Sequence, residues 1–313
     1  MNRKPIIIVA GQPNSIFFEI FFKSLKFKKF KSPLILIASI RLLKSQMYKF
    51  KIKKRINLID LNNIEKSKLN NNFINIINVN LKNKNSHNYI KNCFDIAFEI
   101  MNSSISNKLI NGPINKSKFL DKKFLGITEY ISEKFKVKKV AMLIYNKELS
   151  VCPVTTHLPL KFVSKSITPK IIKEKVILIN NFFKENLGFK PKIAVTGLNP
   201  HCESINKFNE DSKIINPTIK SLKRRGLKID GPFPADTIFL AQNRNKYNVI
   251  LGMYHDQVLT PIKTLKEYDA INITLGLPFY RVSPDHGPNE KMVNKNLSSP
   301  LSMIKALNFL DHK

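Results

Sequence analysis

The sequence is poor in the residues that build disulfides and glycine-rich loops. Its 313 residues include three cysteines, ten glycines and no tryptophan. Because Cys93, Cys152 and Cys202 are odd in number and widely spaced, we expect neither a disulfide framework nor a four-cysteine zinc site. The glycines form no Gly-x-Gly-x-x-Gly fingerprint, so this motif identifies no dinucleotide-binding loop. We therefore expect reduced thiols, which are typical of a cytoplasmic protein.

Long apolar stretches are also absent. No uninterrupted run approaches the roughly 18 apolar residues that a membrane-spanning helix needs. A strand-like segment at residues 6–9 is broken at Gly11 and is too short for the apolar core of a signal peptide. The sequence thus predicts a cytoplasmic protein that has no membrane partner.

Acidic residues are scarce: 22 aspartates and glutamates face 53 lysines and arginines, for a formal net charge of +31. A charge of this size is one sign of a basic nucleic-acid-binding protein, which would bind DNA or RNA with steep salt dependence and without need of its histidines. The lysines are, however, spread among many asparagines and isoleucines, as biased codon use in an AT-rich genome would produce. The two densest stretches, residues 23–31 and 49–55, fit the solvated faces of a helix and an edge strand. We favour incidental charge and no specific nucleic-acid partner.

What is present is an alternation of strand and helix patterns. Apolar runs at residues 6–10, 34–38 and 56–61 fit strands, and residues 16–25, 89–101 and 171–186 fit helices. Residues 62–92 are rich in asparagine and lysine and look like a largely irregular connection. A last helix is expected after Ser299 as its cap, with Pro300 at its first position. This alternation predicts an α/β protein.

Three of the six histidines follow apolar, strand-like runs. Residues 151–156 precede His157, residues 193–198 precede His201, and residues 249–254 precede His255. Ligands of α/β sheets collect beyond the carboxyl ends of strands, and neutral imidazole is a preferred zinc ligand. The pattern therefore predicts a catalytic metal site, although each histidine alone could be a hydrogen-bonded structural residue.

Polar side chains recur around the third histidine. Lys263, Asn272 and Arg281 are donors suited to a phosphate or carboxylate, and the alternative is that the two cations are ordinary surface residues. Asp256 follows His255, and Asp236 lies in a proline-restricted loop. Either carboxylate could orient a metal-bound imidazole or cap its loop.

Taken in order, seven segments resemble the family of 4-hydroxythreonine-4-phosphate dehydrogenases of pyridoxal 5'-phosphate biosynthesis. They are residues 111–116, 155–160, 197–201, 231–237, 253–257, 272–279 and 285–287. The resemblance is strong from about residue 111 to residue 310, and the first third matches in outline only.

The resemblance implies a fold and an assembly. The fold class is two-lobed α/β like isocitrate and isopropylmalate dehydrogenases, with the active site in the interdomain cleft at the interface of a homodimer. Residues 1–125 with 285–313 would form the first lobe, and residues 126–284 the second lobe with most metal and substrate residues.

The resemblance also implies a reaction. The enzyme would use NAD, or NADP, to oxidise 4-phosphooxy-L-threonine at C3, and decarboxylation would leave 3-amino-2-oxopropyl phosphate. His157, His201 and His255 match divalent-metal ligands contributed across the dimer, with zinc expected first and magnesium or cobalt as alternatives. One such metal would serve each site.

Further roles are assigned by the same resemblance. The substrate would contact Thr128, Lys263, Asn272 and Arg281, and the cofactor would contact Asp285, His286 and Gly287. The chemistry of the residues themselves predicts Lys263, Asp256 and Asp236 as the catalytic groups, with Lys263 either taking the proton or holding the charge.

The sequence also departs from the family pattern. Ile127 stands where a substrate-contacting histidine is expected, and an apolar side chain cannot donate a hydrogen bond. Residues 202–209 replace a glycine-rich stretch, and Pro288 and Asn289 replace Thr-Ala near the cofactor. These departures keep two alternatives open: a dehydrogenase of a phosphorylated four-carbon sugar acid, such as threonate or erythronate 4-phosphate, and a structural relic.

Overall fold

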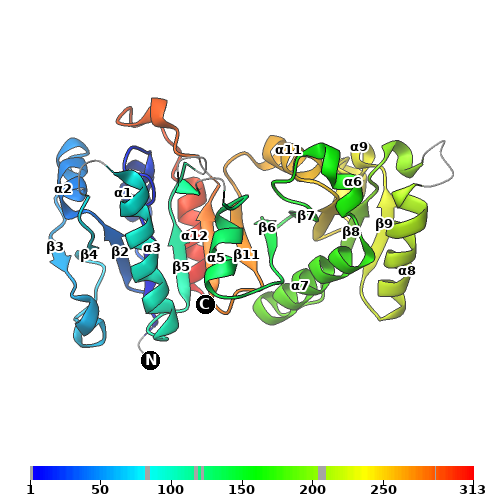
Figure 1. The fold of residues 1–313 in the computed structure, drawn as a ribbon. Coiled ribbons are helices and arrows are strands. Elements are labelled where there is room, and N and C mark those ends of the chain that lie inside the picture. The colour runs from blue at the N-terminus through cyan, green and yellow to red at the C-terminus, as the bar shows by residue number, and fades with distance from the viewer. Residues whose placement is uncertain (1–2, 82–84, 116–118, 121–122, 204–208, 286) are drawn as a thin grey trace. The chain divides into compact units, whose positions relative to one another are not determined.

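The computed structural model describes residues 3–81, 85–115, 119–120, 123–203, 209–285 and 287–313. The chain forms two compact units, Met1–Lys123 with Pro278–Lys313, and Phe124–Leu277 (Figure 1). The chain returns to the first unit at Pro278, seven residues before the boundary expected at residue 285. The reason is that strand β12 (Tyr280–Pro284) pairs in parallel with β5 (Lys108–Asn111) and so belongs to the first unit.

The first unit is built on a parallel sheet with the strand order β3-β4-β2-β1-β5-β12. The strands not yet given are β1 (Ile6–Val9), β2 (Leu34–Ala38), β3 (Ile56–Leu58) and β4 (Ile74–Asn78). Every residue of β1, β2 and β5 is buried. Their nearly continuous aliphatic sequences fit a sheet that helices cover on both faces.

The described helices that cover this sheet include α1 (Phe17–Phe27), α2 (Ile40–Lys49), α3 (Ser86–Asn102) and α12 (Leu301–Asp311). Helix α1 contacts both α2 and α12, so these three share one face. Helix α3 connects β4 to β5. This crossover moves along the sheet in the direction opposite to the crossovers from β1 to β2 and from β2 to β3. Because such crossovers are right-handed, α3 covers the other face.

The prediction of a largely irregular connection over residues 62–92 was wrong, because that stretch contains β4, an inner strand between β3 and β2. Asn75 explains the error. It is 1% exposed, its Nδ2 donates to the carbonyl oxygens of Leu34 (2.9 Å) and Asn70 (3.1 Å), and its Oδ1 accepts from Asn57 (2.9 Å). An asparagine satisfied in this way is compatible with a buried strand, although its type usually marks a turn.

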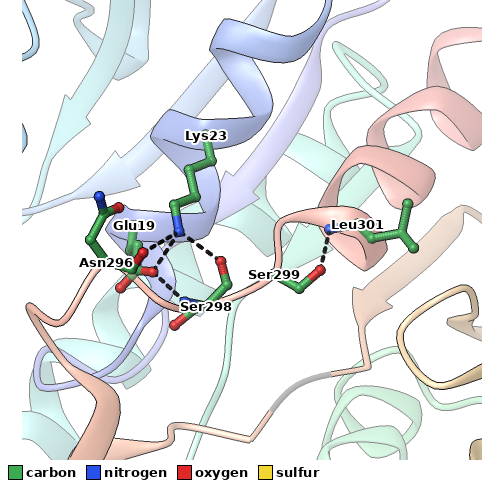
Figure 2. A network of polar contacts seen from close by, with 6 residues as sticks. All are labelled: Glu19, Lys23, Asn296, Ser298, Ser299 and Leu301. Atoms are coloured by element: carbon green, nitrogen blue, oxygen red, sulfur yellow. Dashed lines mark hydrogen bonds and ion pairs between the residues drawn. The ribbon is translucent and has the colours of Figure 1, made fainter.

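The segment before α12 is tied to α1 by a small polar network (Figure 2). The Glu19 carboxylate accepts from the Lys23 ammonium (2.9 Å) and from the backbone N–H of Ser298 (2.5 Å). Lys23 also donates to the carbonyl oxygens of Asn296 and Ser298, each at 2.9 Å. Helix α12 begins at Leu301, one residue after the expected start, and the Ser299 hydroxyl accepts from its first N–H at 3.3 Å.

The second unit has the strand order β11-β6-β7-β10-β8-β9. The strands are β6 (Ala141–Tyr145), β7 (Ser150–Pro153), β8 (Ile193–Thr196), β9 (Ile229–Phe233), β10 (Val249–Gly252) and β11 (Ile271–Leu275). Strand β6 is antiparallel to β11 and β7, whereas β7, β10, β8 and β9 run parallel. The carboxyl ends of those four strands therefore lie along one edge.

The helices of this unit are α5 (Ile127–Lys134), α6 (Val163–Ser166), α7 (Pro169–Leu187), α8 (Asn216–Arg224), α9 (Ala235–Ile238), α10 (Ala241–Arg244) and α11 (His255–Lys266). Helix α11 packs on β7 and β10, and α7 packs on β6 and β11. Val258, Leu259 and Ile262 of α11 are buried in an apolar cluster with Val151 and Ile250 of those strands. Within the residues that the structure describes, no helix is long and apolar enough to cross a membrane.

Candidate active site

The three histidines singled out in the sequence follow three neighbouring parallel strands. Strand β10 lies between β7 and β8, and the loops after β7, β10 and β8 carry His157, His255 and His201 respectively. Because carboxyl ends of parallel strands share an edge, the fold brings all three loops to the same side of the second unit.

Two of the imidazoles lie next to each other. The ring centroids of His157 and His255 are 5.8 Å apart. A side chain at Gly126 would not fit beside them, because a Cβ there would lie 2.6 Å from Cε1 of His157. The Nδ1 atom of His255 is 2.6 Å from an oxygen of Asp256. A carboxylate on one ring nitrogen leaves Nε2 for a further contact.

The third histidine, His201, follows β8. It is exposed, and both it and Cys202 have left-handed backbone angles, with φ values of 55° and 61°. Within the described ranges, no three His, Cys, Asp or Glu side chains come close enough to hold a metal ion. A catalytic zinc site takes three protein ligands. The chemistry of the two adjacent imidazoles of His157 and His255 fits two of the donors of such a site.

Hydrogen bonds connect the three histidine-bearing strand ends. Thr155 Oγ1 donates to the carbonyl oxygen of Met253 (2.8 Å), which links the loops after β7 and β10. Gln257 links β10 to β8: its Oε1 accepts from Met253 N–H (2.7 Å) and Thr196 Oγ1 (2.8 Å), and its Nε2 donates to the Gly197 carbonyl (2.8 Å). Gln257 lies in the segment 253–257 that resembles the family, but the sequence predicted no role for it.

Asp211 holds the loop that leads to His201. It is 1% exposed, and its carboxylate accepts from the backbone N–H groups of Leu198 (2.8 Å) and Asn199 (3.1 Å). It also accepts from Asn199 Nδ2 at 2.8 Å. Sequence analysis missed this residue, and no local signal identifies it, because its partners lie 12 or more positions away in the chain.

Asp236 is exposed at the first turn of α9 and lies near the same loop. Burial raises the pKa of the Cys202 thiol to about 11, and the neighbouring carboxylates of Asp211 and Asp236 add to the shift. Asp236 is thus close enough to the residue after His201 to act on it electrostatically.

The expected substrate residues of this unit lie on three elements. Thr128, in α5, is buried with its hydroxyl 3.5 Å from that of Thr274 in β11. Asn272 lies two positions before Thr274 and therefore on the same face of the strand. Its Oδ1 is buried and has no hydrogen-bond partner within the described part of the chain. Lys263 is exposed in the last turn of α11.

Ile127, the departure from the family pattern, is the first residue of α5 and is 5% exposed. Its side chain is packed in the protein interior, next to the buried Thr128. The structure therefore gives it the role of a core residue.

The remaining candidates lie in the first unit, and this corrects the expected lobe of Arg281. Arg281 is 3% exposed, and its Nε donates to Asn111 Oδ1 at 2.8 Å. Asp285 and Gly287 follow β12, at the edge where the parallel strands end. A Cβ on Gly287 would meet only Asn289, at 3.8 Å, so the backbone there is open to approach. His286 lies outside the described residues.

Comparison with known proteins identifies the relatives of this chain. A 4-hydroxythreonine-4-phosphate dehydrogenase of Sulfurihydrogenibium sp. is 45% identical over 204 residues, which are 64% of this chain and 62% of that protein. The matched segment thus spans less than two thirds of that relative. The crystal structure of a 4-hydroxythreonine-4-phosphate dehydrogenase from Klebsiella pneumoniae is 26% identical, with a TM-score of 0.80 and 99% of each chain covered.

A more distant likeness concerns the fold alone. A β-decarboxylating dehydrogenase from Thermococcus kodakarensis matches with a TM-score of 0.55 at 11% identity, covering 97% of this chain and 82% of the other. The expected α/β fold class is confirmed. The family model of the pyridoxal phosphate biosynthetic protein PdxA matches residues 29–310. This chain therefore belongs to the PdxA family.

Proposed function

We propose that this protein is a dehydrogenase that oxidises 4-phosphooxy-L-threonine at C3 with NAD, or NADP, and releases carbon dioxide and 3-amino-2-oxopropyl phosphate. The reaction is a step of pyridoxal 5'-phosphate biosynthesis and takes place in the cytoplasm. Membership of the PdxA family and the names of the relatives support this proposal. The observation that carries it is the set of three histidines after three adjacent parallel strands.

His157, His201 and His255 would hold one divalent metal ion per site, zinc first, with magnesium or cobalt as alternatives. When bound, such an ion supplies Lewis acidity at the substrate hydroxyl. The adjacency of His157 and His255 supports a division in which one subunit of a homodimer provides these two and the other provides His201. Asp256 fixes the tautomer and orientation of His255 through Nδ1, and Asp236 acts on the His201 loop.

The other residues bind and deprotonate the substrate in this proposal. The Arg281 guanidinium carries a permanent charge in a buried setting, which suits an anionic group of the substrate. Thr128 and Asn272 bind polar groups, and the unsatisfied Oδ1 of Asn272 is available to a hydroxyl or ammonium donor. Lys263 accepts the proton of the C3 hydroxyl. The open backbone at Gly287, with Asp285 and His286, contacts the dinucleotide.

A second substrate class is favoured by one observation. Ile127 is a buried apolar residue where the family pattern has a substrate-contacting histidine. Phosphorylated four-carbon sugar acids, threonate or erythronate 4-phosphate, lack the amino group of the main substrate and are therefore the alternative to test.

The test is NADH formation from 4-phosphooxy-L-threonine by the full-length protein, with and without added zinc. We expect metal-dependent turnover that His255→Ala abolishes. Asp256→Asn should weaken zinc binding by about 10- to 100-fold, because the carboxylate no longer orients the imidazole. His312→Ala, which changes an exposed histidine of the first unit, is the matched control and should retain full activity.

The proposal is wrong if the zinc-loaded, folded protein oxidises neither 4-phosphooxy-L-threonine nor the sugar-acid phosphates. Turnover of a sugar-acid phosphate alone would instead establish the second substrate class and assign its origin to Ile127.

A further inference from the structure

The two densest basic stretches of the sequence meet at one pocket of the first unit. The pocket has a volume of about 550 Å³ and is lined from α1, from the loop between α2 and β3, and from the residues just before β4. A cavity of this size lies within the range of small-molecule sites, about 300–1,000 Å³. The expectation that residues 49–55 form an edge strand was wrong, because they end α2 and form this loop.

Cations dominate the polar part of the lining. Lys26, Lys51, Lys53 and Arg55 are exposed, and in the described part of the chain their side chains form no hydrogen bond or ion pair. Lys54 is half-buried and donates to the carbonyl oxygen of Asn71 at 2.6 Å. Among the described residues that line the pocket there is no carboxylate, so within this part of the chain no negative charge of the lining compensates its five positive charges.

The rest of the lining is apolar and partly aromatic. Phe73, Ile52 and Leu25 are half-buried, and Phe22 lies behind them with its ring 6.1 Å from that of Phe50. An aromatic and aliphatic wall offers a surface on which a planar ring can stack. Cations and a stacking surface therefore line the same pocket.

Lys51 occupies a backbone position that favours glycine. It has a φ of 54° and follows Phe50, the residue that caps the end of α2. The N–H of Lys51 donates to the Tyr48 carbonyl (3.2 Å), and that of Ile52 donates to the Met47 carbonyl (2.9 Å). This is a helix-ending motif in which glycine is the usual residue at the left-handed position. The chain therefore has a lysine at the pocket at some conformational cost.

The pocket lies away from the proposed cofactor residues of the same unit. Arg55 and Phe73 directly precede β3 and β4, so the pocket lies at the amino ends of these parallel strands. The proposed cofactor residues 285–287 follow the carboxyl end of β12 in the same parallel sheet, at the opposite edge. A smaller adjoining hollow of about 280 Å³ shares Lys26 and Lys51, and its Glu19 is neutralised by Lys23 (Figure 2).

We propose that this pocket binds a nucleoside polyphosphate, with the base against Phe73 and Ile52 and the phosphates among Lys26, Lys51, Lys53 and Arg55. Charge complementarity selects a ligand with several negative charges, and the apolar wall selects one that also has a planar ring. The bounded volume favours a single nucleotide over a nucleic-acid strand, which needs a continuous groove.

The experiment is fluorescence anisotropy of an N-methylanthraniloyl derivative of ATP with the full-length protein, at saturating NAD so that the proposed cofactor site is filled. We expect the double variant Lys53→Ser/Arg55→Ser to bind at least about 10-fold more weakly, because two phosphate contacts are lost. The matched control Lys170→Ser/Lys220→Ser removes the same charge from exposed lysines of the second unit and should change affinity by less than about 2-fold.

Of two further variants, one distinguishes an effect on binding from an effect on folding stability. The other distinguishes the contribution of the aromatic ring from that of the positive charges. Lys51→Gly should weaken binding and yet raise the melting temperature, since glycine relieves the left-handed position. Phe73→Ala should weaken ATP binding but leave binding of inorganic tripolyphosphate unchanged.

Equal weakening in the matched control would overturn the proposal in favour of the diffuse positive field of the molecule. Displacement of the probe by tripolyphosphate as strongly as by ATP would overturn the nucleoside part. Tighter binding of an oligonucleotide than of ATP, lost in the same double variant, would replace the proposal with nucleic-acid binding.

Discussion

At the residue scale, burial determines the chemistry of the thiols. Cys152 is 0% exposed in β7, and burial raises the pKa of its thiol to about 12. Burial raises the pKa of the Cys93 thiol, also to about 12. At neutral pH the thiols of Cys93 and Cys152 are therefore protonated, and both are enclosed in the core.

The raised pKa of Cys152 predicts a pH dependence of stability. Its folded pKa exceeds the ordinary value of 9.0, so the stabilisation is complete below pH 9 and is lost as the pH rises toward 12. Between pH 7 and pH 10 this thiol alone should lower the free energy of unfolding by about 1 kcal/mol. Urea unfolding of the wild type and of Cys152→Ala at both pH values measures the effect. The prediction would be contradicted if the free energy of unfolding of Cys152→Ala fell between pH 7 and pH 10 by as much as that of the wild type.

Residue types and short spacings predicted part of the candidate site. His255 and its carboxylate partner Asp256 are adjacent in the chain, so their contact at 2.6 Å could be anticipated. Asp211 could not be found in this way, because its backbone partners Leu198 and Asn199 reach it only through folding. A buried carboxylate has no sequence pattern of its own when its partners are backbone groups.

At the element scale, the ends of β8 and β10 are held together by one side chain, that of Gln257. It makes three hydrogen bonds, to Met253, Thr196 and Gly197, at the edge that carries His201 and His255. The parallel pairing of β8 with β10 sets the distance that this side chain spans.

Gln257→Leu should destabilise the protein by at least about 2 kcal/mol, because it leaves buried polar groups of both strand ends without partners, each costing about 1–3 kcal/mol. Gln257→Glu keeps the acceptor for the Met253 N–H and should cost less. Chemical denaturation gives the free energies of unfolding, and zinc affinity reports whether the histidine loops have moved. Unchanged stability in Gln257→Leu would show that the loops are held by other contacts.

At the scale of the whole molecule, we propose that two copies of the chain share the metal site. One chain brings His157 and His255 together, and within its described residues no third ligand completes the set. We therefore expect a homodimer of about 72 kDa, twice the 36.0 kDa of one chain, by light scattering.

Mixing inactive variants tests how the ligands are divided. His157→Ala combined with His201→Ala should regain activity after subunit exchange, because one of the two sites of the hybrid dimer then has all three histidines. His157→Ala combined with His255→Ala should remain inactive, since each site lacks one ligand. A 36 kDa species with full activity, or recovery in the second mixture, would contradict this arrangement.

The sequence by itself determined the fold class, the strand-end position of the histidines and the membership of a family, because these depend on local periodicity and on residues adjacent in the chain. Tertiary structure decided that residues 74–78 form an inner strand, that Arg281 belongs to the first unit, and that the basic stretches 23–31 and 49–55 contribute to one pocket. These features depend on which strands pair and which loops meet. Asn75 and Asp211 form hydrogen bonds with residues that are distant in the sequence. The residues next to them in the sequence therefore do not indicate these partners.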